Sequence, residues 1–138
     1  MKRVIVLAAL VFAVSAALPM ASAGESGRTF VQNNCRHRVM IRPQRIMFAC
    51  ADGGFYVTGL DWRRWHRFRA AGHGLFHQND CRPSCAGGTF HTIGGRLLLK
   101  DRMHCPRFHH YIFTRAVITF DSRFLGRREI RTTLPCPD

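Results

Sequence analysis

The chain is 138 residues long and has 21 lysines and arginines against eight acidic residues, which gives a formal net charge of +13. This length fits one small domain with a modest core and leaves no room for several domains. The charge predicts attraction to polyanions and anionic membranes. It does not identify a partner, because only Lys2 and Lys100 are lysines, and an arginine bias of this kind also arises from the base composition of a genome.

Residues 1–23 are predicted to form a secretory signal peptide. Residues 1–3 are basic at the second and third positions, 4–18 are an uncharged apolar run, and 21–23 are a small-x-small cleavage site. The apolar run is shorter than the roughly 20 residues that span a bilayer, and no second run follows it, so we expect no membrane span after cleavage. The mature domain is then 24–138, with 19 cations against eight acids and a charge of about +11. We expect it to be secreted.

The cysteines predict a disulfide framework. All of them lie after the predicted cleavage site, their number is even, and the compartment is oxidising. They are Cys35, Cys50, Cys81, Cys85, Cys105 and Cys136. Six cysteines allow about 15 pairings, and the sequence favours only Cys81–Cys85 among the possible pairs.

Short apolar and β-branched segments, separated by glycine and proline, predict an all-β fold. Pro43 cannot donate to a strand ladder, so 39–48 is expected to be two short strands or one edge strand with a bulge. Gly94 and Gly95 are expected to form the turn of a hairpin. The remaining expected strands are 55–60, 75–78, 89–92, 96–100, 111–120 and 127–134. No segment has a sustained helical periodicity, so we expect a small disulfide-stapled sandwich or partly open barrel of about six to eight short strands.

The segment "WRRWHRFR", residues 62–69, combines tryptophan and arginine. Trp62 and Trp65 are three residues apart, so a regular strand would place them on opposite faces, and a bulge near Arg63 and Arg64 would return them to one side. One interpretation places the tryptophans in the core with the arginines solvated between them. The other is a basic aromatic surface that binds anionic ligands. The candidate residues of that surface are Arg63, Arg64, Arg67, Arg69 and Trp65.

The segment "NDCRPSCAGG", residues 79–88, has three interpretations. A metal site formed with His73 and His77 is not expected, because residues four apart in extended chain are more than about 10 Å apart and cannot share one ion. A redox-active pair usually has two intervening residues and a helix N-terminus, and both are missing. We therefore expect a disulfide that fixes the shape of the loop. Such a loop offers an alternative function, a protein-binding module such as a protease inhibitor that presents Arg82.

A small hydrolase is a second alternative. It has little support in the sequence, because no serine stands in a G-x-S-x-G elbow and only Glu25 and Glu129 are glutamates. We expect no catalytic residue, no metal and no cofactor.

Five strings occur in order along the chain: "CADGG" (50–54), "LDWRRW" (60–65), "AAGHGLF" (70–76), "NDCRPSCAGGTF" (79–90) and "YIFTRAVITF" (111–120). Together they resemble a group of small secreted proteins of actinobacteria, and the resemblance covers most of the chain after Cys50. It implies secretion and a compact β domain, and it transfers no catalytic residue. The arginine content of this chain departs from the pattern of the group.

The sequence thus predicts a secreted, cationic, disulfide-stabilised and non-enzymatic protein that binds an anionic polymer or cell surface. It contains no dedicated nucleic-acid-binding motif, and it does not predict an oligomeric state.

Overall fold

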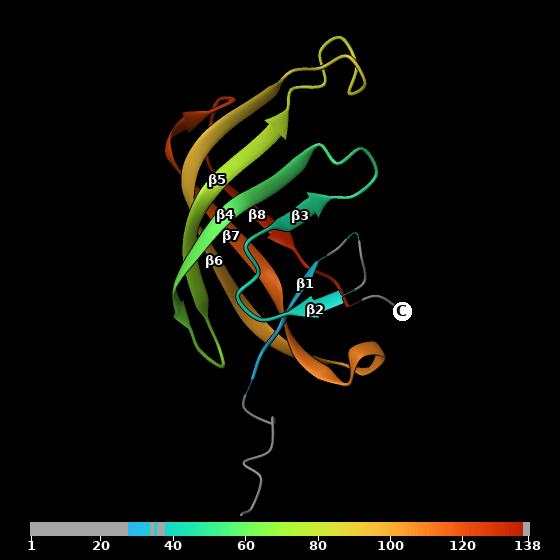
Figure 1. The fold of residues 1–138 in the computed structure, drawn as a ribbon, viewed down its shortest axis with the longest axis vertical. Helices are drawn as coiled ribbons and strands as arrows, with labels where there is room; N and C mark the ends of the chain where they lie inside the picture. Colours follow the sequence, from blue (N-terminus) through green and yellow to red (C-terminus); the bar gives the residue numbers. More distant parts are fainter. Residues whose placement is uncertain (1–27, 34, 36–37, 137–138) are drawn as a thin grey trace, which may run out of the picture.

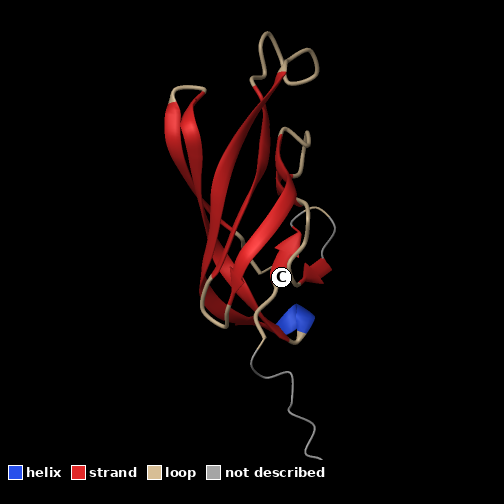
Figure 2. Ribbon diagram, turned by 60° about the vertical axis from the view of Figure 1, so that its left-hand side comes forward, coloured by secondary structure: helices blue, strands red, loops and turns tan. Residues whose placement is uncertain are grey.

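The computed structural model describes residues 28–33, 35 and 38–136, so the predicted signal peptide lies outside the described residues. These residues form strands and one short 3-10 turn (Figures 1 and 2), and none of their helices is long and apolar enough to cross a membrane. The elements are β1 (Val31–Asn33), β2 (Arg38–Met40), β3 (Ile46–Ala49), β4 (Phe55–Trp65), β5 (Ala70–Asn79), β6 (Phe90–Cys105), η2 (Pro106–Phe108), β7 (His110–Phe124) and β8 (Arg127–Thr133).

Strands β3 to β8 form one antiparallel six-stranded sheet in which each strand pairs with the next along the chain. The sheet curls into a half-barrel, and the β1–β2 pair lies on its open side (Figure 1). Phe30 ties the segment before β1 to β7, since its amide donates to the Tyr111 carbonyl at 2.8 Å and its carbonyl accepts from the Phe113 amide at 2.9 Å. The all-β prediction is confirmed, in the form of a partly open barrel.

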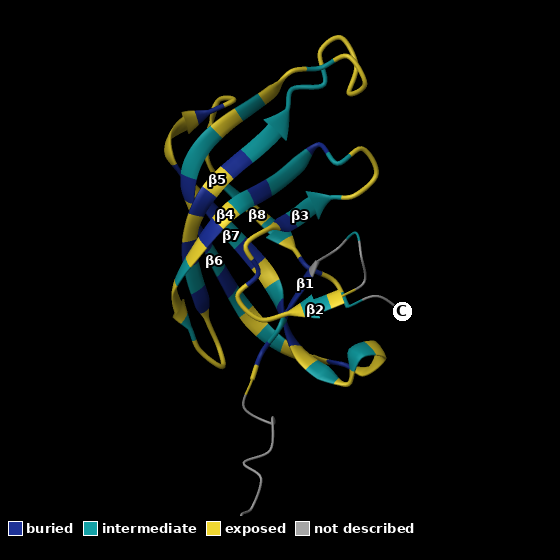
Figure 3. Ribbon diagram, in the orientation of Figure 1, coloured by how far each residue is buried: buried dark blue, intermediate teal, exposed yellow. Residues whose placement is uncertain are grey.

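The core fills the inner, concave face of the half-barrel. Buried residues alternate with exposed ones along the long strands (Figure 3), as the two-residue period of a strand requires. Val57 pairs with Phe76 across β4 and β5, Leu97 pairs with Ile118 across β6 and β7, and all four are fully buried. Val31 of β1 belongs to the same apolar cluster, so the small sheet covers part of this core.

Trp62 and Trp65 lie on the same side of β4, as the predicted bulge requires. The register with β5 shifts between Trp62 and Arg64, and the two indole rings meet edge-on with centroids 4.6 Å apart. The Trp62 Nε1 donates to the Pro43 carbonyl at 2.8 Å, and the Trp65 Nε1 donates to the Thr29 carbonyl at 3.0 Å. Both rings pack against the core cluster, so the interpretation that placed them in the core is correct.

The hairpin predicted at Gly94 and Gly95 is wrong, because β6 runs through both glycines as one strand of 16 residues. A Cβ on Gly95 would lie 2.9 Å from the Thr119 carbonyl oxygen and 3.1 Å from the Phe76 ring, and a Cβ on Gly94 would collide with the Asp121 carboxylate. These glycines are therefore present for close approach between neighbouring groups, not for a turn.

The predicted strands were also too short. The segment expected at 55–60 continues to Trp65, and the one expected at 75–78 begins at Ala70 and includes Gly72 and Gly74. A Cβ on Gly72 would lie 2.7 Å from the Asp61 carbonyl oxygen, so this glycine too makes room inside the sheet.

All six cysteines form disulfides, which join Cys35 to Cys50, Cys81 to Cys85 and Cys105 to Cys136. The predicted Cys81–Cys85 bond is among them. The third bond ties the end of β6 to the segment that follows β8, where Leu134 is fully buried.

Candidate anion-binding site

The outer face of the sheet carries a row of five residues that are direct cross-strand neighbours from β4 to β8. The row consists of Arg64, Ala71, Leu98, Val117 and Arg131. Its two arginines are exposed, whereas its three apolar residues are half-buried. The outer face therefore has an apolar middle with a cation at each edge.

A hollow of about 350 Å³ opens at the β4 end of this row. We call it the β4–β6 hollow; it is lined by Arg63, Arg64, Ala71, Gly72, His73 and Arg96. The bulge in β4 explains why two consecutive arginines, Arg63 and Arg64, are both exposed. Arg96 joins them because the register of β5 and β6 sets it directly opposite His73.

The charge of the β4–β6 hollow is not balanced by acidic residues. Arg63, Arg64 and Arg96 form no ion pair with any acid in the described part of the chain. His73 pairs with Asp121 at 3.1 Å, and Asp61, its neighbour on β4, is exposed on the same face but does not line the hollow. Three arginines thus line one hollow with a small apolar floor, and their guanidinium groups are suited to a phosphate, sulfate or carboxylate group.

The residues predicted from the "WRRWHRFR" segment divide into two groups. Arg63 and Arg64 line the hollow, whereas Arg67 and Arg69 are exposed in and beside the β4–β5 connection and do not line it. Trp65 is packed edge-on against the Phe113 ring, and its ring N–H is already used. Its predicted contact with a ligand therefore has no support in its position, and the binding role of the arginines stays a prediction.

Sequence reasoning missed His73 and Arg96 as members of this site. Arg96 lies 32 residues after Arg64 in the numbering, in a segment that the sequence shows only as apolar residues flanked by cations. The register of three strands brings these residues together, and no local signal in the sequence reports a register of that kind.

Two histidine–aspartate pairs bear on the hydrolase alternative. His73 pairs with Asp121 at 3.1 Å, and His91 pairs with Asp80 at 3.0 Å. Among the described residues, no serine hydroxyl or free thiol is hydrogen-bonded to either histidine, and the Ser84 hydroxyl accepts from the Gly87 amide. The arrangement of an activated nucleophile beside a base is not formed by these groups.

The histidine and the cysteines of the metal interpretation have other bonding partners in the structure. His77 lies between the Thr58 and Thr92 hydroxyls, at 2.9 Å from each, and stacks on Tyr56. Asp52, Cys81 and Cys85 offer three ligand atoms within 4.8 Å of one another, but the two sulfurs are bonded to each other as a disulfide.

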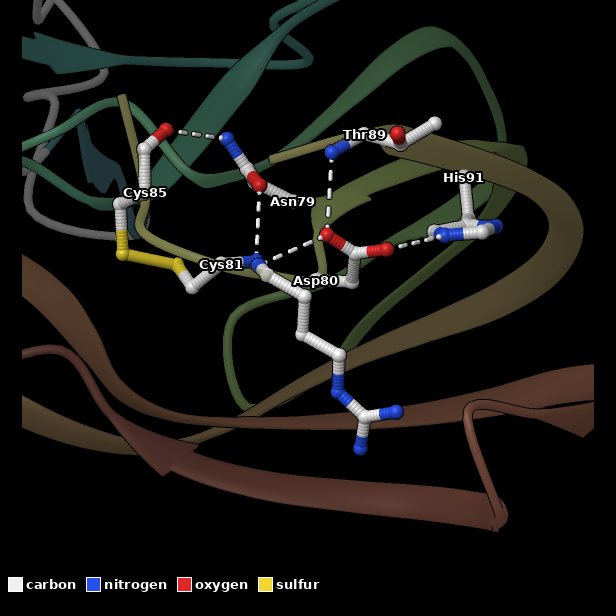
Figure 4. A network of polar contacts seen from close by, with 7 residues as sticks. Asn79, Asp80, Cys81, Cys85, Thr89 and His91 are labelled. Carbon is white, nitrogen blue, oxygen red and sulfur yellow. Dashed lines mark hydrogen bonds and ion pairs between the residues drawn. A yellow bond between two sulfur atoms is a disulfide. The ribbon is translucent and has the colours of Figure 1, made fainter. Parts of the chain in front are cut away.

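The loop closed by Cys81–Cys85, residues 80–88, is the second functional candidate; we call it the disulfide loop (Figure 4). The Asp80 carboxylate accepts from the Arg82 amide at 3.1 Å, the Thr89 amide at 3.0 Å and the His91 ring at 3.0 Å. These donors, His91 first and then the Thr89 and Arg82 amides, lower the pKa of Asp80 to about 2. The loop is therefore fixed at its base by a carboxylate that stays ionised.

Asn79 fixes the same loop from its other side. Its Oδ1 accepts from the Cys81 amide at 2.9 Å, and its Nδ2 donates to the Cys85 carbonyl at 2.8 Å (Figure 4). A hollow of about 500 Å³ lies between this loop and the β7–β8 turn. It is lined by Gln78, Asn79, Asp80, Arg82, His91, Leu125 and Arg127.

Comparisons of the chain with family models, with curated proteins and with solved structures found no match. The resemblance to secreted actinobacterial proteins therefore stays a prediction, and the candidate sites depend on their geometry alone.

Proposed function

We propose that this protein acts outside the cell and binds anionic groups of a polymer or surface through the β4–β6 hollow. The observation that carries the proposal is that Arg63, Arg64 and Arg96 line one hollow with an apolar floor, and that none of the three has an acidic ion-pair partner among the described residues. Three disulfides support an extracellular location, because the cytosol keeps thiols reduced.

Arginine suits this task for two physical reasons. The guanidinium group keeps its charge at every physiological pH, and its planar donors match two oxygens of a phosphate, sulfate or carboxylate group at once. The hollow is open to solvent, so salt screens the attraction, and binding is expected to weaken as the ionic strength rises.

The test compares two double variants with the unaltered secreted protein, with inorganic pyrophosphate as the probe and calorimetry or NMR titration as the measurement. Arg64→Gln with Arg96→Gln is expected to weaken binding by about tenfold or more, because it removes two charged donors from the hollow. Arg82→Gln with Arg127→Gln removes the same charge away from the hollow and is expected to change the affinity by less than about twofold. Equal losses in the two variants would mean that only the total charge matters.

A second candidate function is protein binding through the disulfide loop. The hydrogen bonds of Asp80 and Asn79 and the disulfide hold this loop in one shape, and a rigid loop loses little entropy when it binds. Arg82 is exposed and lines the same hollow as Leu125, a residue that is 43% exposed. The Arg82→Gln/Arg127→Gln variant separates the two candidate functions. It is expected to weaken the binding of a protein partner and to leave the affinity for pyrophosphate almost unchanged.

A further inference from the structure

We infer that the ligand is a linear polyanion that lies across the strands of the outer face, from Arg64 in β4 to Arg131 in β8. This inference rests on the proposed function and adds the shape and length of the ligand. Its chemical class is an extended polymer that carries a phosphate or sulfate group on each unit. The β4–β6 hollow then holds one part of the chain, and a second hollow holds another.

The second hollow has a volume of about 440 Å³ and lies on the same face. We call it the β6–β8 hollow; its lining includes Lys100, Arg115, Val117, Arg131, Thr132 and Thr133. Val117 and Arg131 belong to the cross-strand row that begins at Arg64. In that row Leu98 lies between Ala71, which lines the β4–β6 hollow, and Val117, so apolar residues connect the two hollows.

The cations beside this path repel one another in the unbound protein. Lys100 is the direct cross-strand partner of Arg115, and like charges in that position destabilise a sheet. Two neighbouring strands, β6 and β7, therefore bring one cation each to the same level of the sheet, and a bound polyanion would relieve this repulsion.

The acidic residues of the outer face lie mainly on one side of the path. Asp61 pairs with His73, and Glu129 pairs with Thr119, the partner of Arg96, so both acids lie in the cross-strand row next to the path. Asp121 lies one outward-facing row further from the path. The exception is Asp101, which pairs with Arg115 at 3.1 Å. The path, together with the neighbouring cross-strand pair of Lys100 and Arg115, therefore has an excess of positive charge.

Two of the arginines along the path form ion pairs that solvent already reaches. Arg115 pairs with Asp101, and Arg131 pairs with Glu129 at 2.6 Å; the arginine side chains are 62% and 77% exposed. Ion pairs with this exposure contribute little net stability. Both arginines can therefore exchange their acidic partner for an anionic group of the ligand.

The register also sets the length of the ligand. Arg64 and Arg131 are four strand spacings apart, and at about 4.8 Å per spacing the path is roughly 19 Å long. A short anion occupies one hollow. A chain that reaches both hollows makes its second contact within the same complex, so its affinity rises steeply once it is long enough.

The experiment measures the affinity of linear polyphosphates that range from pyrophosphate to chains longer than about 19 Å. The unaltered protein is expected to bind the long chains about tenfold or more tightly than chains too short to reach both hollows, after correction for the number of phosphates. Lys100→Gln with Arg131→Gln should abolish this rise, whereas pyrophosphate binding at the β4–β6 hollow, followed by the amide shifts of Ala71 and Gly72, should weaken far less than it does in Arg64→Gln with Arg96→Gln. Arg82→Gln with Arg127→Gln is the control of equal charge and should keep the rise.

The outcomes separate this inference from the proposed function. The inference of a ligand that lies across the strands is wrong if affinity rises only in proportion to the number of phosphates, or if the Lys100→Gln/Arg131→Gln variant keeps the steep rise. In both cases the proposed binding at the β4–β6 hollow is unaffected. If Arg64→Gln with Arg96→Gln leaves pyrophosphate binding unchanged, the proposed function itself is wrong. A parallel series of sulfated oligosaccharides shows whether sulfate or phosphate is the preferred group.

Discussion

Asp80 shows how a single side chain can fix the shape of the disulfide loop. Its carboxylate accepts from two amides and from the His91 ring, and its side chain is 21% exposed. Each of these donors favours the ionised form, which is why the pKa of Asp80 falls to about 2. The loop geometry therefore persists across the physiological pH range.

The pH dependence of the loop follows from the direction of this shift. Because the pKa of Asp80 is lower in the folded protein than its ordinary value of 3.8, its stabilising contribution is complete above about pH 4 and is lost as the pH falls through about 2. We expect the NMR shift of the Thr89 amide proton to titrate with a midpoint near 2. Asp80→Asn should remove this titration. A midpoint near 3.8 would show that the hydrogen bonds do not favour the ionised form.

At the scale of one element, β6 depends on two adjacent glycines that face opposite sides of the sheet. Gly95 faces the inner side, where a Cβ would meet the Thr119 backbone and the Phe76 ring. Gly94 faces the outer side, where a Cβ would meet the Asp121 carboxylate, which is 59% exposed. The backbone and the buried ring cannot move aside, whereas an exposed carboxylate can.

This difference gives a prediction for two matched substitutions. Gly95→Ala is expected to lower the free energy of unfolding by about 1–3 kcal/mol, because it overpacks a filled core. Gly94→Ala should lower it by less than about 1 kcal/mol, because it disturbs only the exposed hydrogen bond between His73 and Asp121. Urea denaturation of the two variants measures both values. A greater loss for Gly94→Ala would mean that the His73–Asp121 pair matters more to the fold than its exposure indicates.

At the scale of the whole molecule, the disulfides differ in the length of chain that they close. Cys105 and Cys136 are 31 residues apart, whereas Cys81 and Cys85 are four apart. The chain-entropy relation gives about 3–4 kcal/mol for the longer loop and about 2 kcal/mol for the shorter one. The longer bond also holds the segment with Leu134 against the core.

Replacement of each pair by alanine tests this order. Cys105→Ala with Cys136→Ala should lower the free energy of unfolding by more than Cys81→Ala with Cys85→Ala does, as measured by denaturation under non-reducing conditions. The shorter disulfide should instead affect the disulfide loop, seen as a change in the Thr89 amide shift with little change in the remaining spectrum. The reverse order of stability would mean that the disulfide loop contributes to the global fold.

Local sequence patterns are enough to predict the all-β class, the pairing of Cys81 with Cys85 and the bulge that returns Trp62 and Trp65 to one side of β4. These features depend on local patterns: β-branched residues, a short loop between two cysteines and the two-residue period of a strand. The sequence also identifies Arg63 and Arg64 as candidate binding residues. It does not show which other residues line the hollow with them.

Which distant residues meet depends on the way the whole chain folds. Gly94 and Gly95 have the composition of a turn, yet the neighbouring strands make them positions of close approach. Arg96 reaches the β4–β6 hollow, and Arg131 reaches the β6–β8 hollow, through the register of strands far apart in the chain. The physical reason is that the period of a strand gives the face on which a side chain lies, whereas its neighbours depend on how all the strands pair around one core.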